Sequence, residues 1–271
     1  MADFKKITEQ PSAYDHLEQT ETATLLYNMN REDQRVALAV REVIPAITDL
    51  VEALVPRFLS GGRLFYIGAG TSGRLGILDA SEIPPTYGMP FDRVIGLIAG
   101  GDGAIRKAVE HAEDNTTQAW RDLEAWNIGA NDAVVGIAAS GTTPYVLGGV
   151  RKARAEGLLT AGITNNPGSP LAEAAEIPIE VNVGPEFVTG STRMKSGTSQ
   201  KLVLNMISTA LMIRIGRVEG NRMVHMQLSN NKLIDRGTRY LMESLKLSYE
   251  DAGELLKQHG SVQKALEASG N

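Results

Sequence analysis

The chain of 271 residues contains no cysteine. Disulfide bonds, thiol nucleophiles and thiolate metal sites are therefore excluded together. The four histidines are too widely separated to form an HxxxH or HxH pattern, so we expect no zinc site and no other bound metal. They are His16, His111, His225 and His259.

Long apolar runs are also missing. No stretch approaches the ~18 residues that a membrane-spanning helix needs, and the first ten residues, MADFKKITEQ, lack the apolar core of a signal peptide. Basic residues are not in excess, because 27 Lys and Arg face 32 Asp and Glu for a net charge of −5. We therefore expect a cytoplasmic protein that binds neither membranes nor nucleic acid, and that holds any anionic ligand with local groups.

The middle of the chain alternates short apolar runs with helical patterns, which is typical of a parallel sheet with helices on both faces. The apolar runs predicted to be strands are residues 63–68, 93–100, 132–140, 158–166 and 176–183. Helices are predicted from Ser72 to near Glu82 and at 104–126, 144–156 and 195–214. The predicted fold is α/β: a three-layer αβα sandwich with a five-stranded, mainly parallel sheet.

Helical patterns also flank this core. Residues 31–59 have apolar residues at three- and four-residue spacing, which indicates one or two amphipathic helices with a kink at Pro45. The tail has only short helical patterns. We expect an N-terminal helical segment packing on the core at 1–60, a ligand-binding domain at 61–230 and a small C-terminal helical segment at 231–271.

Two of the predicted strands run into loops rich in glycine and hydroxyl residues. Glycine lets a ligand approach the backbone, hydroxyls donate hydrogen bonds, and a following helix offers unpaired amides. One such loop could equally be a capped turn, but two at the same edge of a sheet predict a phosphate site. The candidate ligands are Gly70, Thr71 and Ser72 after the first strand, and Ser140, Gly141, Thr142 and Thr143 after the third.

A dinucleotide site is the weaker interpretation of the first loop. Its glycines fit the GxGxxG spacing, but the position ~20 residues further on, where a ribose-binding acid is expected, lies near a glycine that follows two prolines. That interpretation also leaves the second loop without a role.

Three further places carry candidate functional side chains. Residues 184–201 crowd polar groups into a loop before a helix, and Glu186, Ser191 and Lys195 are the candidate substrate ligands there. Glu82 precedes Pro84 and is expected at a rigid corner where its helix ends. A solvent-exposed carboxylate would be the commoner role for Glu82, and likewise for Glu113, which ends the sequence AVEHAE. Both follow helical stretches, and we expect both to lie in loops at the carboxyl edge of the sheet.

Taken together, these segments resemble the SIS (sugar isomerase) domain and, more narrowly, the family of N-acetylmuramic acid 6-phosphate etherases. The matching stretches include IGAGTSGRLGILDASEIPPTYG, VVGIAASGTTPYVLGG and EFVTGSTRMKSGTSQKLVLNMIST. They cover most of residues 60–210. The resemblance implies an αβα sandwich, a homodimer and a phosphorylated amino sugar as the substrate.

The resemblance also implies an activity. Members of this family remove the D-lactyl ether of N-acetylmuramic acid 6-phosphate in cell-wall sugar recycling, which gives N-acetylglucosamine 6-phosphate. By motif, Glu82 corresponds to the proton donor and Glu113 to the second catalytic carboxylate. Two carboxylates suffice for an elimination next to an aldehyde, so no cofactor is expected.

Two alternatives share the fold and the phosphate loops. A sugar-phosphate isomerase needs a base but no acid to expel lactate. A non-enzymatic sensor of sugar phosphates, similar to the glucokinase regulatory protein, would carry two such domains, whereas this chain has room for one. Release of lactate separates the etherase from both.

Overall fold

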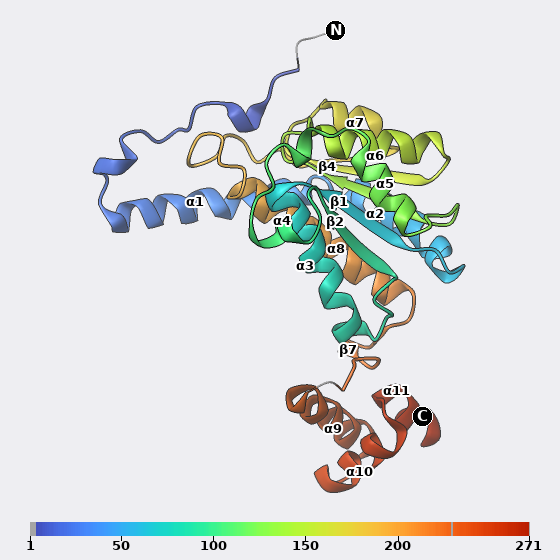
Figure 1. Cartoon of the computed structure of the whole chain (residues 1–271). Helices are drawn as coiled ribbons and strands as arrows, with labels where there is room; N and C mark the ends of the chain where they lie inside the picture. The colour runs from blue at the N-terminus through green and yellow to red at the C-terminus, as the bar shows by residue number, and fades with distance from the viewer. Residues whose placement is uncertain (1–3, 229, 271) are drawn as a thin grey trace.

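The computed structural model describes residues 4–228 and 230–270. Its centre is a five-stranded parallel sheet of order β2-β1-β3-β4-β5, enclosed between two layers of helices (Figure 1). The strands are β1 (Leu64–Gly68), β2 (Val94–Ile98), β3 (Ala133–Ile137), β4 (Leu159–Thr164) and β5 (Ile177–Glu180). Each strand lies inside its predicted run, so the predicted αβα sandwich is confirmed.

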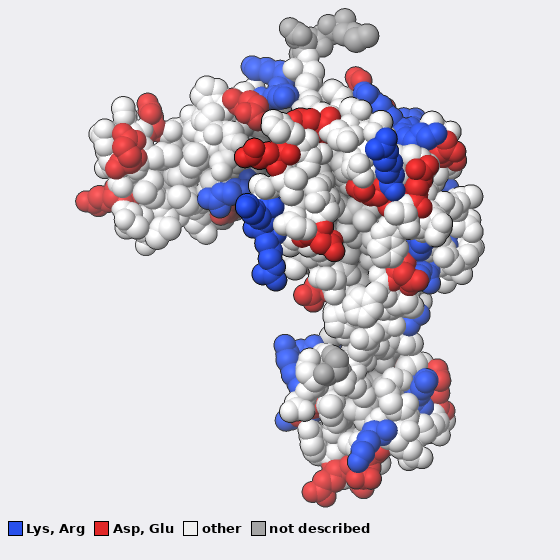
Figure 2. Space-filling model, in the orientation of Figure 1, with Lys and Arg blue, Asp and Glu red and all other residues white. Residues whose placement is uncertain are grey.

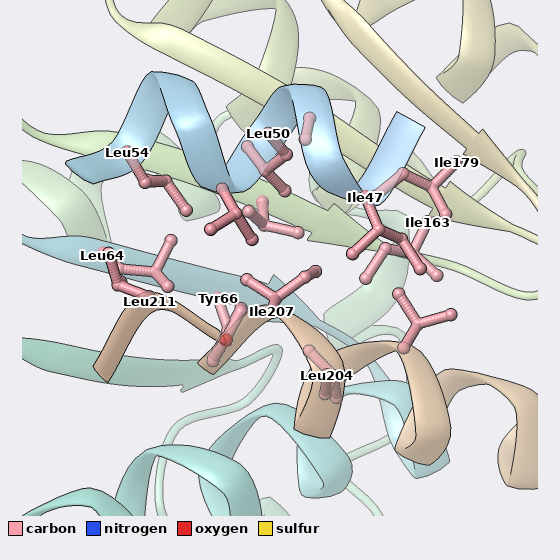
Figure 3. Close-up of a cluster of buried hydrophobic side chains, with 14 of the residues drawn as sticks. Ile47, Leu50, Leu54, Leu64, Tyr66, Ile163, Ile179, Leu204, Ile207 and Leu211 are labelled. Carbon is pink, nitrogen blue, oxygen red and sulfur yellow. The ribbon is translucent and has the colours of Figure 1, made fainter. Parts of the chain in front are cut away.

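Alternate residues of β1 face opposite helical layers, as the pleat of a strand requires. Leu64 and Tyr66 pack in one core, which Figure 3 shows, and Phe65 and Ile67 pack in the other. The first core is formed with α1 (Thr22–Arg41), α2 (Ile44–Leu59), α3 (Gly70–Tyr87) and α8 (Lys195–Arg214). The second is formed with α5 (Gln118–Ala125), α6 (Pro144–Ala155) and α7 (Pro170–Ala174). Because both faces are covered, the strands are apolar throughout rather than alternating.

The helix after β1 differs from its predicted course. We expected it to end near Glu82, but α3 continues through Pro84 and Pro85, so that expectation is wrong. Ile83 and Pro84 are buried, and their packing outweighs the preference of a residue before proline for an extended conformation. The helix ends only at Gly88, which adopts the left-handed conformation with φ of 64°.

Glycines set the distance between α3 and the sheet. A Cβ atom on Gly76 of α3 would lie 2.9 Å from the Cβ of Tyr66, and one on Gly96 of β2 would lie 2.6 Å from the backbone of Ile77. Neither approach is possible for a larger residue, so the helix backbone rests directly on β1 and β2. This contact fixes where the backbone of α3 lies on the sheet.

The prediction of a single helix at 104–126 is also wrong. The chain instead forms α4 (Gly103–Arg106), a 3-10 turn η3 (Ala112–Asp114) and α5. The side-chain oxygen of Asn115 accepts hydrogen bonds from the backbone amides of Thr117 and Gln118, at 3.0 and 3.1 Å. These bonds start α5 and separate it from the preceding turn.

The pattern at 31–59 corresponds to two helices. Pro45 lies in the first turn of α2, where a missing amide hydrogen costs nothing, so the proline separates the helices rather than bending one. The first helix, α1, begins earlier than predicted, at Thr22, and projects from the sandwich (Figure 1). Figure 2 shows acidic side chains at its tip, and on the same face of the molecule Lys and Arg are interspersed with Asp and Glu.

The C-terminal helices are set apart from the sandwich (Figure 1). A hairpin of β6 (Val218–Glu219) and β7 (Arg222–Met223) leads to α9 (Asn231–Leu245), α10 (Tyr249–His259) and α11 (Val262–Ala268). These helices bury a core of their own, which includes Leu241 and Leu256. Across residues 4–228 and 230–270, none of the helices has the length and apolarity needed to cross a membrane.

Candidate active site

The direction in which strands are added to the sheet reverses between β1 and β3. From β1 the chain passes through α3 to β2 on one side, whereas β3, β4 and β5 extend the sheet on the other. In open parallel sheets ligands bind outside the carboxyl ends of the strands at such a reversal. The loops after β1 and β3 flank this point, and they are the two loops that the sequence predicts to bind phosphate.

The loop after β3 is arranged to receive an anion. Ser140 Oγ accepts hydrogen bonds from the amide and the hydroxyl of Thr142, at 3.2 and 3.1 Å, so its own hydrogen remains available to donate. Thr143 is the N-cap of α6 but makes no side-chain cap, which leaves the first amides of the helix unpaired. Gly141 is required for the turn, because its φ is 67° and a Cβ there would lie 2.2 Å from Ser169 Oγ.

The loop after β1 offers amides more than hydroxyls. Ser72 is buried and its hydroxyl donates to Gln200 Oε1 at 2.9 Å, which connects α3 to α8. The methyl group of Thr71 faces α8, where a Cβ on Gly197 would lie 3.4 Å from it. Gly70 has open space around it. Of the three predicted ligands in this loop, Gly70 is therefore the most accessible and Ser72 already has a structural partner.

Glu186 caps α8. Its two carboxylate oxygens accept hydrogen bonds from the backbone amides of Lys195 and Ser196, both at 2.9 Å, and its side chain is 1% exposed. The N-terminus of α8 thus already holds an anion, unlike those of α3 and α6. This geometry favours a structural role for Glu186 over the predicted contact with substrate.

Lys195 is likewise engaged inside the protein. Its Nζ lies 2.6 Å from Glu32 Oε2 of α1, and both side chains are buried. Burial raises the pKa of Glu32, but the hydrogen bond and the charge of Lys195 lower this pKa by more, so the net shift is downward. Of the three ligands predicted in this segment, Glu186 and Lys195 are buried against partners within the protein. Ser191 is partly exposed, and its side chain has no hydrogen-bond partner among the described residues.

Glu113 lies where the sequence predicts, at the carboxyl edge of the sheet. It belongs to η3, is exposed, and lines a cavity of about 260 Å³ together with Gly70 and Ala99, which follow β1 and β2. The Arg74 guanidinium forms another part of the wall and donates to the backbone oxygen of Ile105 at 2.7 Å. The Glu113 carboxylate can therefore approach a ligand held by the first loop.

Glu82 lies elsewhere. It follows Gly70 by twelve residues on α3, which places it about 18 Å further along the helix axis. It is exposed and lines a second cavity, of about 370 Å³, between α3 and α8. The expectation that both carboxylates lie at the carboxyl edge is wrong for Glu82, and within one chain the two line different cavities.

The cavity beside Glu82 contains two ionisable groups that the sequence analysis missed, Asp79 and Lys201. Asp79 is buried, and Ser208 Oγ donates to its Oδ1 at 3.0 Å. The buried hydroxyl of Tyr66 acts on the same carboxyl group, but neither it nor Asp79 Oδ2 has a partner with the geometry of a hydrogen bond among the described residues. Burial raises the pKa of Asp79 to about 6, against the opposing effect of Ser208. The available signal was the spacing of Asp79 and Glu82, which places them on one helix face.

No group of three or more His, Asp or Glu side chains in the described parts of the chain could hold a metal ion. The groups that line the two cavities and the loop after β3 are carboxyl groups, hydroxyls, amides, Lys201 and the Arg74 guanidinium. They can bind an anion and transfer protons.

Comparisons with known proteins identify both the domain and its relatives. A family description for the SIS domain matches residues 105–210, and one for the N-terminal SIS domain of glucokinase regulatory protein matches residues 46–154. An N-acetylmuramic acid 6-phosphate etherase of Porphyromonas gingivalis is 65% identical over 98% of this chain and 97% of its own length. Proteins of the same name from Bacteroides fragilis and Vibrio vulnificus are 62% and 57% identical, over 98% and 87% of this chain and 94% and 79% of their own lengths.

Solved structures show the same fold at much lower identity. A phosphoheptose isomerase from Francisella tularensis superposes with a TM-score of 0.55 over 72% of this chain and 100% of its own, at 16% identity. A phosphosugar isomerase from Bacteroides fragilis gives a TM-score of 0.54 over 70% of this chain and 91% of its own, at 23% identity. At these identities the likeness concerns the fold alone.

Proposed function

The chain belongs to the family of N-acetylmuramic acid 6-phosphate etherases, and from that premise we propose how its residues carry the reaction. It is a carbon–oxygen lyase that cleaves the D-lactyl ether of N-acetylmuramic acid 6-phosphate by elimination and water addition. The products are N-acetylglucosamine 6-phosphate and D-lactate. The observation that carries this conclusion is the 65% identity over 98% of the chain.

The chemistry requires two proton transfers. In the open-chain sugar the ether at C3 lies β to the aldehyde, so the hydrogen on C2 is acidic and a carboxylate can remove it. The lactyl oxygen leaves only if an acid protonates it. Water then adds at C3 with the roles reversed. We assign the base to Glu113 and the acid to Glu82.

We place the substrate phosphate in the loop after β3. Three features support this: the unpaired amides of α6, the free hydrogen of Ser140, and the uncommitted hydroxyl of Thr143 beside them. The backbone amide of Gly70 completes the site from the neighbouring loop. The N-terminus of α8 is not available, because Glu186 occupies it.

The separation of the carboxylates leads to a second proposal, that the enzyme is a homodimer and that Glu82 serves the active site of its partner. A sugar phosphate held near Gly70 is too short to reach a residue about 18 Å further along α3, even with the Glu82 side chain turned towards the helix N-terminus. Within one chain the acid and the base therefore cannot act on the same molecule.

The surface next to Glu82 supports this assembly. An apolar groove of about 550 Å³ runs between α2 and α8, and its walls include Ile44, Met206 and Ile213, which are 43%, 39% and 49% exposed. The groove shares Asn205 and Thr209 with the cavity that Glu82 lines. In the proposed dimer a second copy covers the groove, and its loops after β1 and β3 lie next to Glu82.

One experiment tests the activity directly. The purified protein incubated with N-acetylmuramic acid 6-phosphate should release lactate and N-acetylglucosamine 6-phosphate in equal amounts. An isomerase would instead interconvert an aldose and a ketose without lactate, and a sensor would bind the sugar without turnover. We further propose that the protein acts in the cytoplasm, on a phosphorylated amino sugar and without nucleic-acid or membrane partners.

A further inference from the structure

One cation lies in the cavity beside Glu82. Among the described residues that line this cavity, α3 contributes the carboxyl groups of Asp79 and Glu82, and only Lys201 of α8 is positively charged. The remaining lining groups are apolar side chains, hydroxyls and the amide of Asn205. A negatively charged group that enters this cavity therefore has a single charged partner available.

The charge of Lys201 has no carboxylate partner in the part of the chain that the structure describes. In the described residues no carboxylate lies within ion-pair distance of it, whereas Lys195, six residues earlier on α8, is buried against Glu32. Asn205, one turn further along, holds the side chain in place: in the amide orientation that satisfies both groups, its oxygen accepts a hydrogen bond from Lys201 Nζ at 2.8 Å. An ammonium group has three donors, so two remain for a ligand.

We propose that Lys201 binds the carboxylate of the D-lactyl group and is a specificity-determining residue of the etherase. This inference rests on the proposed assignment of Glu82 as the acid for the lactyl oxygen. The lactyl carboxylate is attached to the same carbon as that oxygen. Whatever binds the carboxylate must therefore lie in the cavity that Glu82 lines.

Electrostatics supports the same assignment. Without a cation, the lactyl carboxylate would enter a cavity that already contains two carboxyl groups, and like charges repel at short distance. Lys201 compensates that charge. It also lowers the pKa of Asp79, which shows that its field reaches the floor of the cavity. A charge-assisted hydrogen bond from the ammonium group would orient the leaving group towards Glu82.

The product provides the control ligand. N-acetylglucosamine 6-phosphate has the same phosphate and the same C2 hydrogen but no lactyl group, so Lys201 has nothing to bind in it. The assignment predicts an effect on one ligand and none on the other. A phosphate-binding or purely structural lysine would affect both equally.

The test compares Lys201→Met with Lys201→Arg, which keeps the charge, and with Lys257→Met, an exposed lysine of α10. For Lys201→Met we expect KM for N-acetylmuramic acid 6-phosphate to rise by about 10- to 100-fold, the loss expected for one hydrogen bond to a charged group. Exchange of the C2 hydrogen of N-acetylglucosamine 6-phosphate in deuterated water should stay within about twofold of the wild type, as for a residue that does not touch this ligand. Lys201→Arg should recover most of the affinity, and Lys257→Met should behave as the wild type.

Calorimetric titration in the Glu113→Ala background, in which cleavage is blocked, gives a readout that does not depend on turnover. The Glu113→Ala protein should bind the lactyl sugar phosphate more tightly than the product, and adding Lys201→Met should remove that preference. Equal losses for both ligands, or an unchanged preference, would overturn the proposal. Wild-type protein that binds the lactyl sugar but releases no lactate would refute the proposed activity instead, while the binding comparison would still decide the role of Lys201.

Discussion

Lys195 of α8 and Glu32 of α1 form a buried ion pair, with Nζ 2.6 Å from Oε2. The residues are 163 positions apart in the sequence. The Tyr14 hydroxyl also donates to Glu32 Oε1, at 3.2 Å, so the pair joins the N-terminal segment, the projecting helix and the start of α8. A lysine that the sequence suggests as a substrate ligand thus connects distant parts of the fold.

This pair should make stability depend on acid pH. The folded pKa of Glu32 is below its ordinary value of 4.5, so the stabilisation is complete above that value and is lost as the pH falls through the lower folded pKa. The free energy of unfolding should therefore fall more steeply below pH 4.5 in the wild type than in Glu32→Gln. Urea denaturation across the acid range measures this, and parallel curves would contradict it. At neutral pH, Lys195→Met should lower the free energy of unfolding by less than the ~3–5 kcal/mol expected for a fully uncompensated buried charge, because Arg35 at 3.4 Å and the Tyr14 hydroxyl still contact Glu32.

Asp79 should have the opposite effect. The pKa of Asp79 is raised from 3.8 to about 6. The contribution of this carboxyl to the free energy of unfolding is therefore most favourable below pH 3.8 and is lost as the pH rises through about 6. Asp79→Asn should therefore be more stable than the wild type at pH ~8, by up to ~3 kcal/mol for two pKa units, and show little gain at pH ~4. Melting temperatures at the two pH values check the sign. A gain that is larger in acid would rule out a buried carboxyl of raised pKa.

Two of the hydroxyls predicted to bind phosphate, those of Ser140 and Ser72, should give different results when they are removed. Ser140→Ala should raise KM for the sugar phosphate by the equivalent of ~1.5–3 kcal/mol, because it removes one hydrogen bond to a charged oxygen. Ser72→Ala should mainly lower the melting temperature, because its hydroxyl donates to Gln200. Steady-state kinetics and thermal unfolding of both variants test the division. The reverse pattern would move the phosphate to the loop after β1.

The variants Glu82→Ala and Glu113→Ala should lose different reactions. Glu82→Ala should lose lactate release but still exchange the C2 hydrogen of N-acetylglucosamine 6-phosphate, which has no lactyl group to expel. Glu113→Ala should lose both reactions. Each loss should be ~10²–10⁴-fold, the usual contribution of a general acid or base. If Glu113→Ala keeps exchange and Glu82→Ala loses it, the roles are exchanged.

Mixing the same two inactive variants tests the proposed dimer. If Glu82 serves the partner's site, a hybrid dimer of Glu82→Ala and Glu113→Ala has one intact site, with Glu113 from one chain and Glu82 from the other. Random exchange of subunits should then restore about one quarter of the wild-type activity, since half the dimers are hybrids with one working site each. If both carboxylates act within one chain, mixing restores nothing.

Much of this arrangement is visible in the sequence because it depends on local patterns. The five apolar runs, the glycine-rich loops and the bounds of α6 and α8 follow from residues that are neighbours in the chain. The position of Glu113 follows in the same way, since it comes soon after β2. Loops that follow parallel strands must meet at one edge of a sheet.

The errors arise where distant contacts decide the outcome. Pro84 and Pro85 are strong signals for the end of a helix, but burial of Ile83 and Pro84 carries α3 past them and leaves Glu82 on a helix face. The partners of Glu186 and Lys195 depend on how α8 and α1 meet, which no local pattern encodes.

The glycine contacts that hold α3 against β1 and β2 have a consequence for communication between subunits. They make α3 move as a rigid body. In the proposed dimer, the first turn of this helix contacts the substrate of its own subunit, and Glu82 near its C-terminal end contacts the substrate bound by the partner subunit. A tilt that tightens the first turn around an anion must also move that acid. Occupancy of one site would then alter turnover at the other, and saturation curves would depart from a simple hyperbola.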